Sequence, residues 1–345
     1  MGKIFQMATK TIIDSLQRPL LDLRISVTDR CNFRCSYCMP KSIFNQKYPY
    51  LPKSDIITYE EILRVVKLLI PFGLRKVRIT GGEPFIRHDL TKFLKELVLL
   101  PNIKVSITTN GSLLEKHLDF LRQIGINQIT ISLDSITNQN FKKIINAKFS
   151  IDEVLAAIDQ SVKLGFTIKI NMVVIKDINH QEILPMVEYF RSRYPNKVIL
   201  RFIEFMDVGN YIGWQMDKVI SANEIFSIIH NRFPLKTAVS DNYGEVATRY
   251  QFEDGIGEVG IISSVTKPFC RDCTRMRLTA NGKLFTCLFA SSGYDLKTLL
   301  RDGSDRQLIN TITDIWHKRD DRYSELRATN INSQNQKVEM SFIGG

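Results

Sequence analysis

Strand-like and helix-like stretches alternate from residue 20 to residue 206, and this alternation limits the fold more than any other feature of the chain. The strand-like stretches cover residues 20–28, 75–80, 103–109, 127–133, 167–175 and 197–206. Helical patterns lie between them, at roughly 90–100, 113–124, 152–164 and 181–193, and most clearly in TYEEILRVVKLL, where Thr58 and Glu61 form a capping box. The pattern predicts an α/β fold with a parallel sheet and right-handed crossovers.

Several of the predicted strands are polar on one face and aliphatic on the other. In the first, Leu23 and Ile25 share a face, and Arg24 lies on the opposite one. Because helices must cover the aliphatic faces, the polar faces point inward. A half-solvated antiparallel sheet shows the same alternation, but the helix-length connections argue against hairpins. With six repeats we expect an incomplete (β/α)6 TIM-like barrel whose open lumen, lined by Arg24, Arg78 and Lys169, suits a polyanion.

A distinctive motif follows each of the first four predicted strands. The first strand leads to CNFRCSYC, the second to GGEP, the third to TNG and the fourth to SLDS. Chemistry in such barrels sits at the carboxyl ends of the strands, so we expect these four loops to meet at one mouth. Each of the short motifs alone indicates only a turn, and the combination is far more specific.

The six cysteines form two triplets. Cys31, Cys35 and Cys38 are spaced C-x3-C-x2-C, and Cys270, Cys273 and Cys287 are spaced C-x2-C-x13-C. Disulfides are disfavoured in a chain of this length without a secretory signal. Zinc is the stronger alternative, but each triplet lacks a fourth ligand nearby in the sequence. Three thiolates can instead hold a 4Fe-4S cluster and leave one iron open to a small molecule.

The net charge of +11 and the pI of about 9.3 favour an anionic partner or substrate. Dense Lys/Arg blocks typical of nucleic-acid-binding arms are absent from the sequence. No apolar run is long enough to span a membrane, and the N-terminus lacks the apolar core of a secretory signal. We therefore expect a cytoplasmic protein that binds neither nucleic acid nor membrane.

The motifs resemble those of the radical S-adenosylmethionine (SAM) enzymes, whose signatures match CNFRCSYC and TGGEP. The longer strings LRISVTDRCNFRCSYCMP and PFCRDCTRMRLTANGKLFTCLF, together with the terminal FIGG, resemble the GTP 3′,8-cyclases, the branch of that family that opens molybdenum cofactor biosynthesis. The resemblance runs from Arg18 to Gly345. It implies a radical SAM partial barrel over residues 1–210 and a C-terminal region over residues 211–345 that closes the barrel mouth.

The resemblance also implies a role for individual residues. Two 4Fe-4S clusters would be held by Cys31, Cys35 and Cys38 and by Cys270, Cys273 and Cys287. SAM would contact Tyr37, Gly82, Ser132 and Met206. The substrate set would be Arg24, Arg78, Thr109, Lys169, Arg275, Met276 and Arg277. Gly344 and Gly345 would reach into the active site, where glycine leaves room and tolerates unusual backbone angles.

By the same resemblance, reductive cleavage of SAM would give a 5′-deoxyadenosyl radical that takes H3′ from GTP. Attack of C3′ on C8 would then give 3′,8-cyclo-7,8-dihydro-GTP. The implied partners are a flavodoxin- or ferredoxin-like electron donor and a downstream cyclic pyranopterin monophosphate synthase, and a homodimer is left open.

Three alternatives compete with this interpretation. A peptide-modifying radical SAM enzyme also carries C-terminal cysteines, but normally more than three. A zinc-ribbon nucleic-acid binder explains the charge and the C-x2-C spacing, but not GGEP or C-x3-C. A scaffold without catalysis needs neither triplet. Metal analysis separates these readings, because two clusters require about eight irons with matching sulfide.

Overall fold

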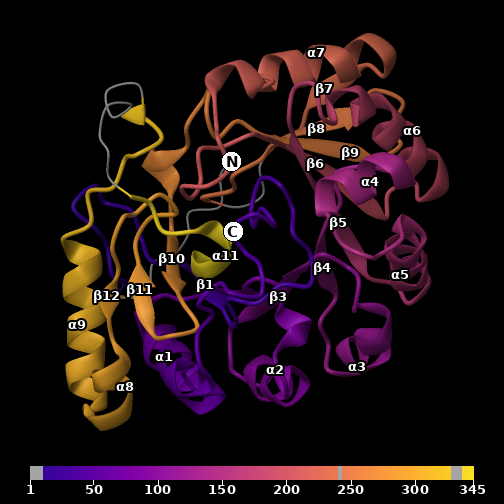
Figure 1. Ribbon diagram of the computed structural model, residues 1–345. Helices are drawn as coiled ribbons and strands as arrows, with labels where there is room; N and C mark the ends of the chain where they lie inside the picture. Colours follow the sequence, from indigo (N-terminus) through magenta and orange to yellow (C-terminus); the bar gives the residue numbers. More distant parts are fainter. Residues whose placement is uncertain (1–10, 240–242, 328–335) are drawn as a thin grey trace.

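The computed structural model describes residues 11–239, 243–327 and 336–345, and it contains all six predicted strands in parallel, in sequence order. They are β1 Asp22–Ser26, β2 Lys76–Thr80, β3 Lys104–Thr109, β4 Gln128–Ser132, β5 Thr167–Val174 and β6 Val198–Glu204. The helices between them are α1 Tyr59–Leu69, α2 Leu90–Val98, α3 Leu118–Gln123, α4 Asn138–Ile145, α5 Ile151–Lys163 and α6 Ile183–Arg193. Figure 1 shows the strands in an arc with these helices outside it. The α/β prediction is confirmed.

The C-terminal part of the chain extends the sheet at both edges. Its strands are β7 Leu235–Thr237, β8 Thr248–Phe252, β9 Glu258–Ile262, β10 Arg275–Leu278, β11 Lys283–Phe285 and β12 Tyr294–Asp295. Strand β9 pairs parallel with β6, and β10 pairs parallel with β1. Over the described residues the sheet runs β12-β11-β10-β1-β2-β3-β4-β5-β6-β9-β8-β7 and is not closed. The open sheet agrees with the expected incomplete barrel, but β9 and β10 were not predicted.

The core lies between the sheet and the helices outside it. Leu23, Ile25, Val77 and Ile79, on the outward faces of β1 and β2, are fully buried. Helix α1 begins after Thr58, whose side chain forms the predicted capping box with Glu61. The alternation seen in the sequence thus places aliphatic side chains under the helices and leaves the polar ones facing inward.

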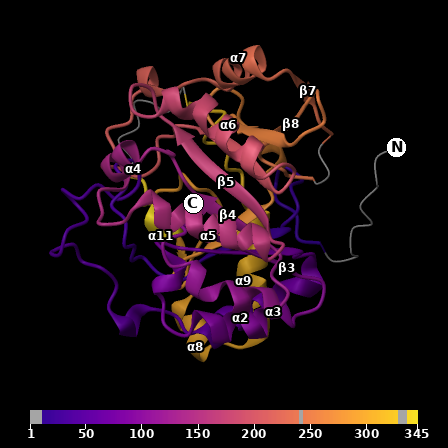
Figure 2. The same ribbon diagram turned by 90° about the vertical axis from the view of Figure 1, so that its right-hand side faces the viewer.

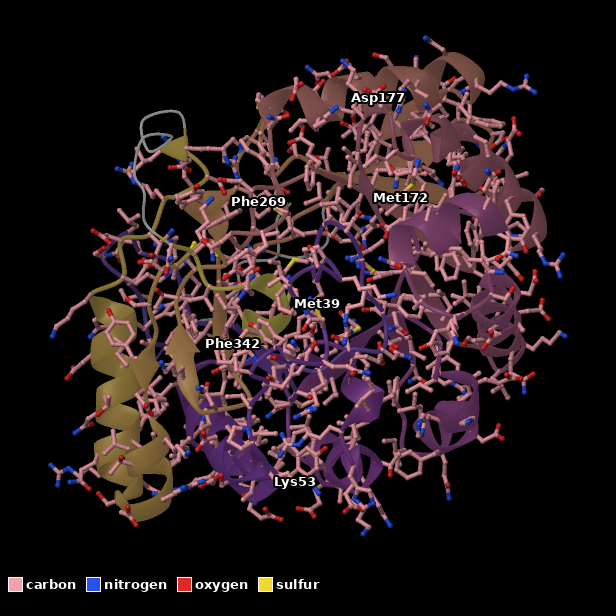
Figure 3. The ribbon with its side chains drawn as sticks, in the orientation of Figure 1. Met39, Lys53, Met172, Asp177, Phe269 and Phe342 are labelled. Atoms are coloured by element: carbon pink, nitrogen blue, oxygen red, sulfur yellow. The ribbon has the colours of Figure 1, made fainter. Side chains whose placement is uncertain are left out.

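The remaining helices follow β6 and β12 and end with a short helix inside the molecule. They are α7 Ala222–Arg232, α8 Lys297–Asp302, α9 Asp305–His317 and α11 Met340–Ile343. The C-terminus lies near the centre of the molecule in both ribbon views (Figures 1 and 2). Figure 3 places Phe342 of α11 near the middle and Lys53 at the lower edge. Among the described residues, no helix has the length and apolar character needed to cross a membrane.

Candidate active site

A cavity of about 1320 Å³ lies on the inner, polar side of the sheet. All six cysteines line it, although the two triplets are more than 230 residues apart in the sequence. Most of the other predicted site residues line it as well: Arg24, Tyr37, Arg78, Gly82, Thr109, Ser132, Lys169, Met206, Arg275, Arg277 and Gly345. The fold therefore brings both cysteine triplets and the predicted cations into one space.

The first triplet lies in the loop after β1. The sulfur of Cys31 accepts a hydrogen bond from the backbone N–H of Phe33 at 3.4 Å, and the Nδ2 of Asn110 lies 3.8 Å from it. Burial raises the pKa of the Cys31 thiol to about 12 and also raises the pKa values of Cys35 and Cys38. These thiols need a cation to become thiolates, and metal binding displaces such protons.

Two glycines fix the GGEP loop against the cysteine loop. Gly81 has a φ of +148°, and a Cβ there would lie 2.6 Å from the carbonyl oxygen of Thr28. A Cβ at Gly82 would lie 2.2 Å from the carbonyl oxygen of Arg30. The N–H of Gly82 instead donates to the Thr28 carbonyl at 2.8 Å, and the N–H of Glu83 to that of Arg30 at 2.8 Å. Only glycine permits this approach of two backbones.

Glu83 joins the second and third loops. Its buried carboxylate accepts hydrogen bonds from the Thr109 hydroxyl and from the Asn110 N–H, both at 2.7 Å. Burial raises the pKa of Glu83 to about 7, although these hydrogen bonds oppose the shift. The Thr109 hydroxyl is therefore already engaged with Glu83 at the edge of the cavity.

Tyr37 and Asp134 join the cysteine loop to β5. The Tyr37 hydroxyl donates to the Asp134 Oδ2 at 2.6 Å, and the Val173 N–H donates to the Oδ1 at 2.8 Å. Burial raises the pKa of Asp134 to about 6, against the effect of these two hydrogen bonds. This pair holds the residue between Cys35 and Cys38 in one orientation.

The second triplet lies around β10 and β11. The Arg275 Nη2 is 3.2 Å from the sulfur of Cys273. Burial raises the pKa of Cys273, but Arg275 and Arg319 outweigh it and hold the pKa at about 6. Burial raises the pKa of Cys287 to about 11. Cys273 thus becomes a thiolate readily in its cationic surroundings.

The donor set fits iron-sulfur clusters better than zinc. In the part of the chain that the structure describes, no three His, Cys, Asp or Glu residues are placed to hold a single metal ion. Each triplet supplies only thiols, and each faces a cavity large enough for a cluster and a ligand. Three thiolates that face open space suit a 4Fe-4S cluster with one iron left for a ligand.

Cations form a row across the floor of the cavity. Arg24 on β1 is in register with Arg277 on β10 and with Arg78 on β2. Neighbouring strands are about 4.8 Å apart, so three like charges lie side by side. Among the described residues, the Nε atoms of these three arginines and of Arg201 are buried without a hydrogen-bond partner, whereas the Nη groups of Arg78 and Arg201 donate to threonine hydroxyls. Burial, followed by repulsion from Arg277, Arg275 and Arg78, holds the pKa of Arg24 well below its usual value.

Lys169 and Arg201 extend this row along β5 and β6. Burial and the neighbouring cations lower the pKa of Lys169 to about 8 and that of Arg201 to about 9. Cations that are brought together and desolvated in this way favour a polyanion as their ligand. Arg24, Arg78 and Lys169 line one cavity as expected, and the binding of a polyanion there stays a prediction.

Arg201, Met276 and Gly344 lie differently with respect to the cavity from what the sequence predicts. Arg201 lines the cavity but was not among the predicted residues, although it alternates with the outward-facing Leu200 and Phe202. Met276 is fully buried in the core on the other face of β10 from Arg275 and Arg277, so its side chain faces away from the cavity. Gly344 packs against β2, and a Cβ there would lie 2.6 Å from the Thr80 methyl.

Comparison with known proteins assigns the family. Residues 25–190 match the radical SAM superfamily model, and residues 198–325 match the model for the molybdenum cofactor synthesis C region. Over 341 residues the chain is 43% identical to the GTP 3′,8-cyclase of Staphylococcus epidermidis, and the match covers 97% of this chain and 99% of that protein. The chain belongs to the GTP 3′,8-cyclase family. The family homologue from Acidothermus cellulolyticus is also 43% identical, with 98% of this chain and all of that protein covered.

The fold of this GTP 3′,8-cyclase family member is also found in a solved radical SAM structure. The crystal structure of Streptococcus suis SuiB bound to S-adenosylmethionine has a TM-score of 0.62 at 15% identity, covering 90% of this chain and 69% of that one. At this identity the likeness concerns the fold alone. Membership in the family implies 4Fe-4S clusters and SAM as cofactors, which agrees with the two cysteine triplets.

Proposed function

We propose that the protein is a GTP 3′,8-cyclase and catalyses the first step of molybdenum cofactor biosynthesis. The observation that carries this proposal is the row of arginines that lines the same cavity as the two cysteine triplets, with buried Nε atoms that have no hydrogen-bond partner among the described residues. A nucleoside triphosphate has the charge to pair with this row and the length to reach from it toward a cluster. Family membership supports the same substrate.

The first triplet is proposed to hold the cluster that binds SAM. Cys31, Cys35 and Cys38 supply its thiolates, with one iron left for the ligand. SAM is proposed to contact Tyr37, Gly82, Ser132 and Met206, which line the cavity next to this triplet. The Tyr37–Asp134 and Glu83–Asn110 hydrogen bonds keep the loops around this site in place.

The second triplet is proposed to hold a cluster whose open iron faces the guanine of GTP. Cys270, Cys273 and Cys287 supply the thiolates. The substrate-binding side chains are Arg24, Arg78, Thr109, Lys169, Arg275 and Arg277, with Met276 contributing through its backbone, and we add Arg201 to this set. The cations hold the triphosphate and so set the position of the ribose between the two clusters.

When bound, the first cluster and SAM would supply a 5′-deoxyadenosyl radical at the cost of one electron. Transfer of H3′ from GTP to this radical, formation of the C3′–C8 bond, and uptake of a second electron and a proton at N7 would give 3′,8-cyclo-7,8-dihydro-GTP. The protein's own residues orient the nucleotide and exclude water. Gly344 and Gly345 are proposed to complete the site from the C-terminus, and the inward position of α11 supports this role.

The finer architecture and the partners belong to the same proposal. We assign residues 1–210 to a (β/α)6 partial barrel and residues 211–345 to a region that closes its mouth. The reaction takes two electrons from outside the chain, one to cleave SAM and one to reduce the cyclised nucleotide radical, which calls for a flavodoxin- or ferredoxin-like one-electron donor. A synthase that forms cyclic pyranopterin monophosphate would consume the product. A homodimer is tested by light scattering of the cluster-loaded protein.

The test is an anaerobic turnover experiment. Protein reconstituted with iron and sulfide is mixed with dithionite, SAM and GTP, and the products are separated. We expect 5′-deoxyadenosine together with a cyclised nucleotide. Deoxyadenosine without a nucleotide product would keep the radical chemistry and reject GTP. Neither product from a protein with intact clusters would reject both.

A further inference from the structure

Two distant parts of the chain meet in a buried ion cluster beside the second triplet. Asp14 and Arg18 precede β1, and Arg319 follows α9. The side chains of Arg18 and Asp14 are 0% exposed, and that of Arg319 is 1% exposed. We name these three residues the Asp14 brace.

The Asp14 carboxylate holds the two guanidinium groups together. Its Oδ2 accepts from the Arg18 Nε at 2.6 Å and from the Arg319 Nη1 at 3.0 Å. Its Oδ1 accepts from the Arg18 backbone N–H at 2.8 Å. The Asp321 Oδ2 also lies 3.4 Å from the Arg319 Nε, but Asp14 is the carboxylate that binds both arginines, so removing its charge loosens both.

Both arginines donate to the backbone of the cysteine triplet. The Arg18 Nη1 donates to the carbonyl oxygen of Cys270 at 2.8 Å. The Arg319 Nη1 donates to the carbonyl of Cys273 at 2.8 Å, and its Nε donates to that of Thr286, the residue before Cys287, at 3.1 Å. One carboxylate thus controls the backbone at all three cysteines.

The brace has a clear task because the three cysteines come from two separate segments. Cys270 and Cys273 precede β10, whereas Cys287 follows β11. Three thiols from two segments fit one rigid cluster only if their backbones are held at fixed separations. Replacing a residue that hydrogen-bonds to a metal ligand and orients it typically lowers metal affinity by about 10- to 100-fold.

We propose that Asp14, Arg18 and Arg319 are positioning residues that preorganise Cys270, Cys273 and Cys287 for their cluster. This inference rests on the proposed function, because it takes the second triplet to be a cluster site. Arg18 and Arg319 hold the triplet by its backbone carbonyls, and the charge of Arg319, which lines the cavity, also acts on the Cys273 thiol. It leaves the first triplet, on the loop after β1, unaffected.

Arg64 provides a matched control. It too is an arginine tied to the C-terminal helices, with its Nε 2.7 Å from the Asp305 Oδ1. Its Nη1 and Nη2 donate to the carbonyls of Leu300 and Gly303 at 2.9 and 2.6 Å. An Arg64→Ala variant therefore loosens α8 and α9 without touching a residue of the triplet.

The experiment uses the full chain in a Cys31→Ala/Cys35→Ala/Cys38→Ala background, which retains only the second triplet. Asp14→Asn, Arg319→Gln, Arg319→Lys and Arg64→Ala are added to it singly. Each protein is reconstituted anaerobically with iron and sulfide. Iron content and the rate of iron loss to a strong chelator are measured, together with the EPR spectrum of the dithionite-reduced cluster.

We expect Asp14→Asn and Arg319→Gln to lose iron about 10-fold faster than the parent or more, with a changed EPR spectrum. Arg64→Ala should match the parent. Arg319→Lys keeps the buried charge, so we expect this variant to fold. A single ammonium group cannot reach Asp14 and the carbonyls of Cys273 and Thr286 at once, so we expect a rate of iron loss between those of the parent and Arg319→Gln. If thermal unfolding of the cluster-free chains shows that Asp14→Asn is unfolded, Arg319→Lys decides the question.

A reciprocal background, Cys270→Ala/Cys273→Ala/Cys287→Ala, shows whether the effect is local. There Asp14→Asn should leave the iron loss of the first cluster unchanged. Equal rates for the brace variants and Arg64→Ala, or equal effects on both clusters, would overturn the inference alone. A parent that takes up no iron at the second triplet would overturn the cluster assignment as well.

Discussion

At the scale of single residues, the cations of the cavity are held in an unfavourable state that an anionic ligand relieves. Lys169 shows this best, because its pKa is lowered to about 8. Burial is the largest cause, and repulsion from Arg201, Arg78 and Lys76 adds to it, whereas Glu245 acts in the opposite direction. Below pH 8 the free protein therefore carries this charge, and above pH 8 it loses it. A bound triphosphate stabilises the charged form and raises the pKa again.

The affinity for GTP should consequently fall as the pH rises through 8. Above that pH, Lys169 must take up a proton from solution when GTP binds. The uptake of one proton lowers the GTP affinity by about tenfold between pH 7 and pH 9. Equilibrium dialysis of GTP against the cluster-loaded protein measures this. Lys169→Arg is the control, because a guanidinium starts from a pKa about two units higher than an ammonium and so loses its charge at a higher pH. Titration of the nucleotide and of Arg201 is common to both proteins. A parallel pH dependence in the two proteins would contradict the assignment.

Arg201 should contribute to triphosphate binding. Its Nη2 donates only a long hydrogen bond of 3.3 Å to the Thr130 hydroxyl, and its buried Nε has no partner among the described residues, so a phosphate in the cavity can pair with it. A charge-assisted hydrogen bond is worth about 1.5–3 kcal/mol. Arg201→Ala should weaken GTP binding at least about tenfold and leave guanosine binding unchanged. Arg232→Ala, at an exposed side chain on α7, is the control. Equal losses for GTP and guanosine would exclude a phosphate contact.

Alternation along the strands predicts most of the cations that line the cavity. Arg201 is missed because the sixth predicted strand extends beyond its true end. Met206 has the same parity as the outward-facing Phe202, so alternation along the predicted strand 197–206 would turn its side chain away from the cavity. The structure ends β6 at Glu204, so Met206 lies in a loop to which strand parity does not apply. Within the strand, Arg201 faces inward between the buried Leu200 and Phe202.

At the scale of elements, a short strap holds the C-terminal tail to the loop after β6. The Asp207 carboxylate accepts from the Lys337 Nζ at 2.7 Å. The Asn210 N–H donates to the Glu339 Oε1 at 2.9 Å, and the Lys337 N–H donates to the Asn210 Oδ1 at 2.8 Å. Gly209 permits this approach, since a Cβ there would meet the Glu339 carboxylate at 2.2 Å.

Loosening this strap should release the tail without affecting the clusters. Asn210→Ala removes the side-chain hydrogen bonds from Asn210 to Lys337 and Glu339 and keeps the backbone one, so we expect turnover to fall by about tenfold. Carboxypeptidase should remove Gly344 and Gly345 faster, while iron content stays at the parent level. Asn45→Ala, an exposed asparagine bonded within its own loop, is the control. Unchanged protease resistance in Asn210→Ala would contradict the role of the strap.

The six strands and their helices could be predicted because each has a clear period and caps. Strands β9 and β10 could not, because their partners are distant in sequence: β10 pairs with β1, more than 240 residues earlier. Arg275, Met276, Arg277 and Leu278 alternate between charged and apolar side chains, which is typical of a strand, whereas the family resemblance identifies the first three only as substrate-binding residues. Its period places both arginines on the inner face and Met276 in the core.

At the scale of the whole molecule, the sheet brings residues from both ends of the chain to one cavity. Because α11 contacts β1 and the C-terminus lies near the centre, removing Gly344 and Gly345 alters the cavity while leaving the cysteine loops in place. We expect this truncation to abolish cyclisation with iron content unchanged. Parallel iron and product analysis of the intact and shortened chains measures both. Retained cyclisation in the shortened chain would remove the tail from the site.

The central claim is that the cavity holds the C3′ hydrogen of GTP where the 5′-deoxyadenosyl radical can take it. The most direct test supplies cluster-loaded protein with SAM and GTP deuterated at C3′, and determines the mass of the 5′-deoxyadenosine formed. The account predicts that the deoxyadenosine carries one deuterium and appears together with the cyclised nucleotide. Deoxyadenosine without deuterium, formed alongside unchanged GTP, would contradict it.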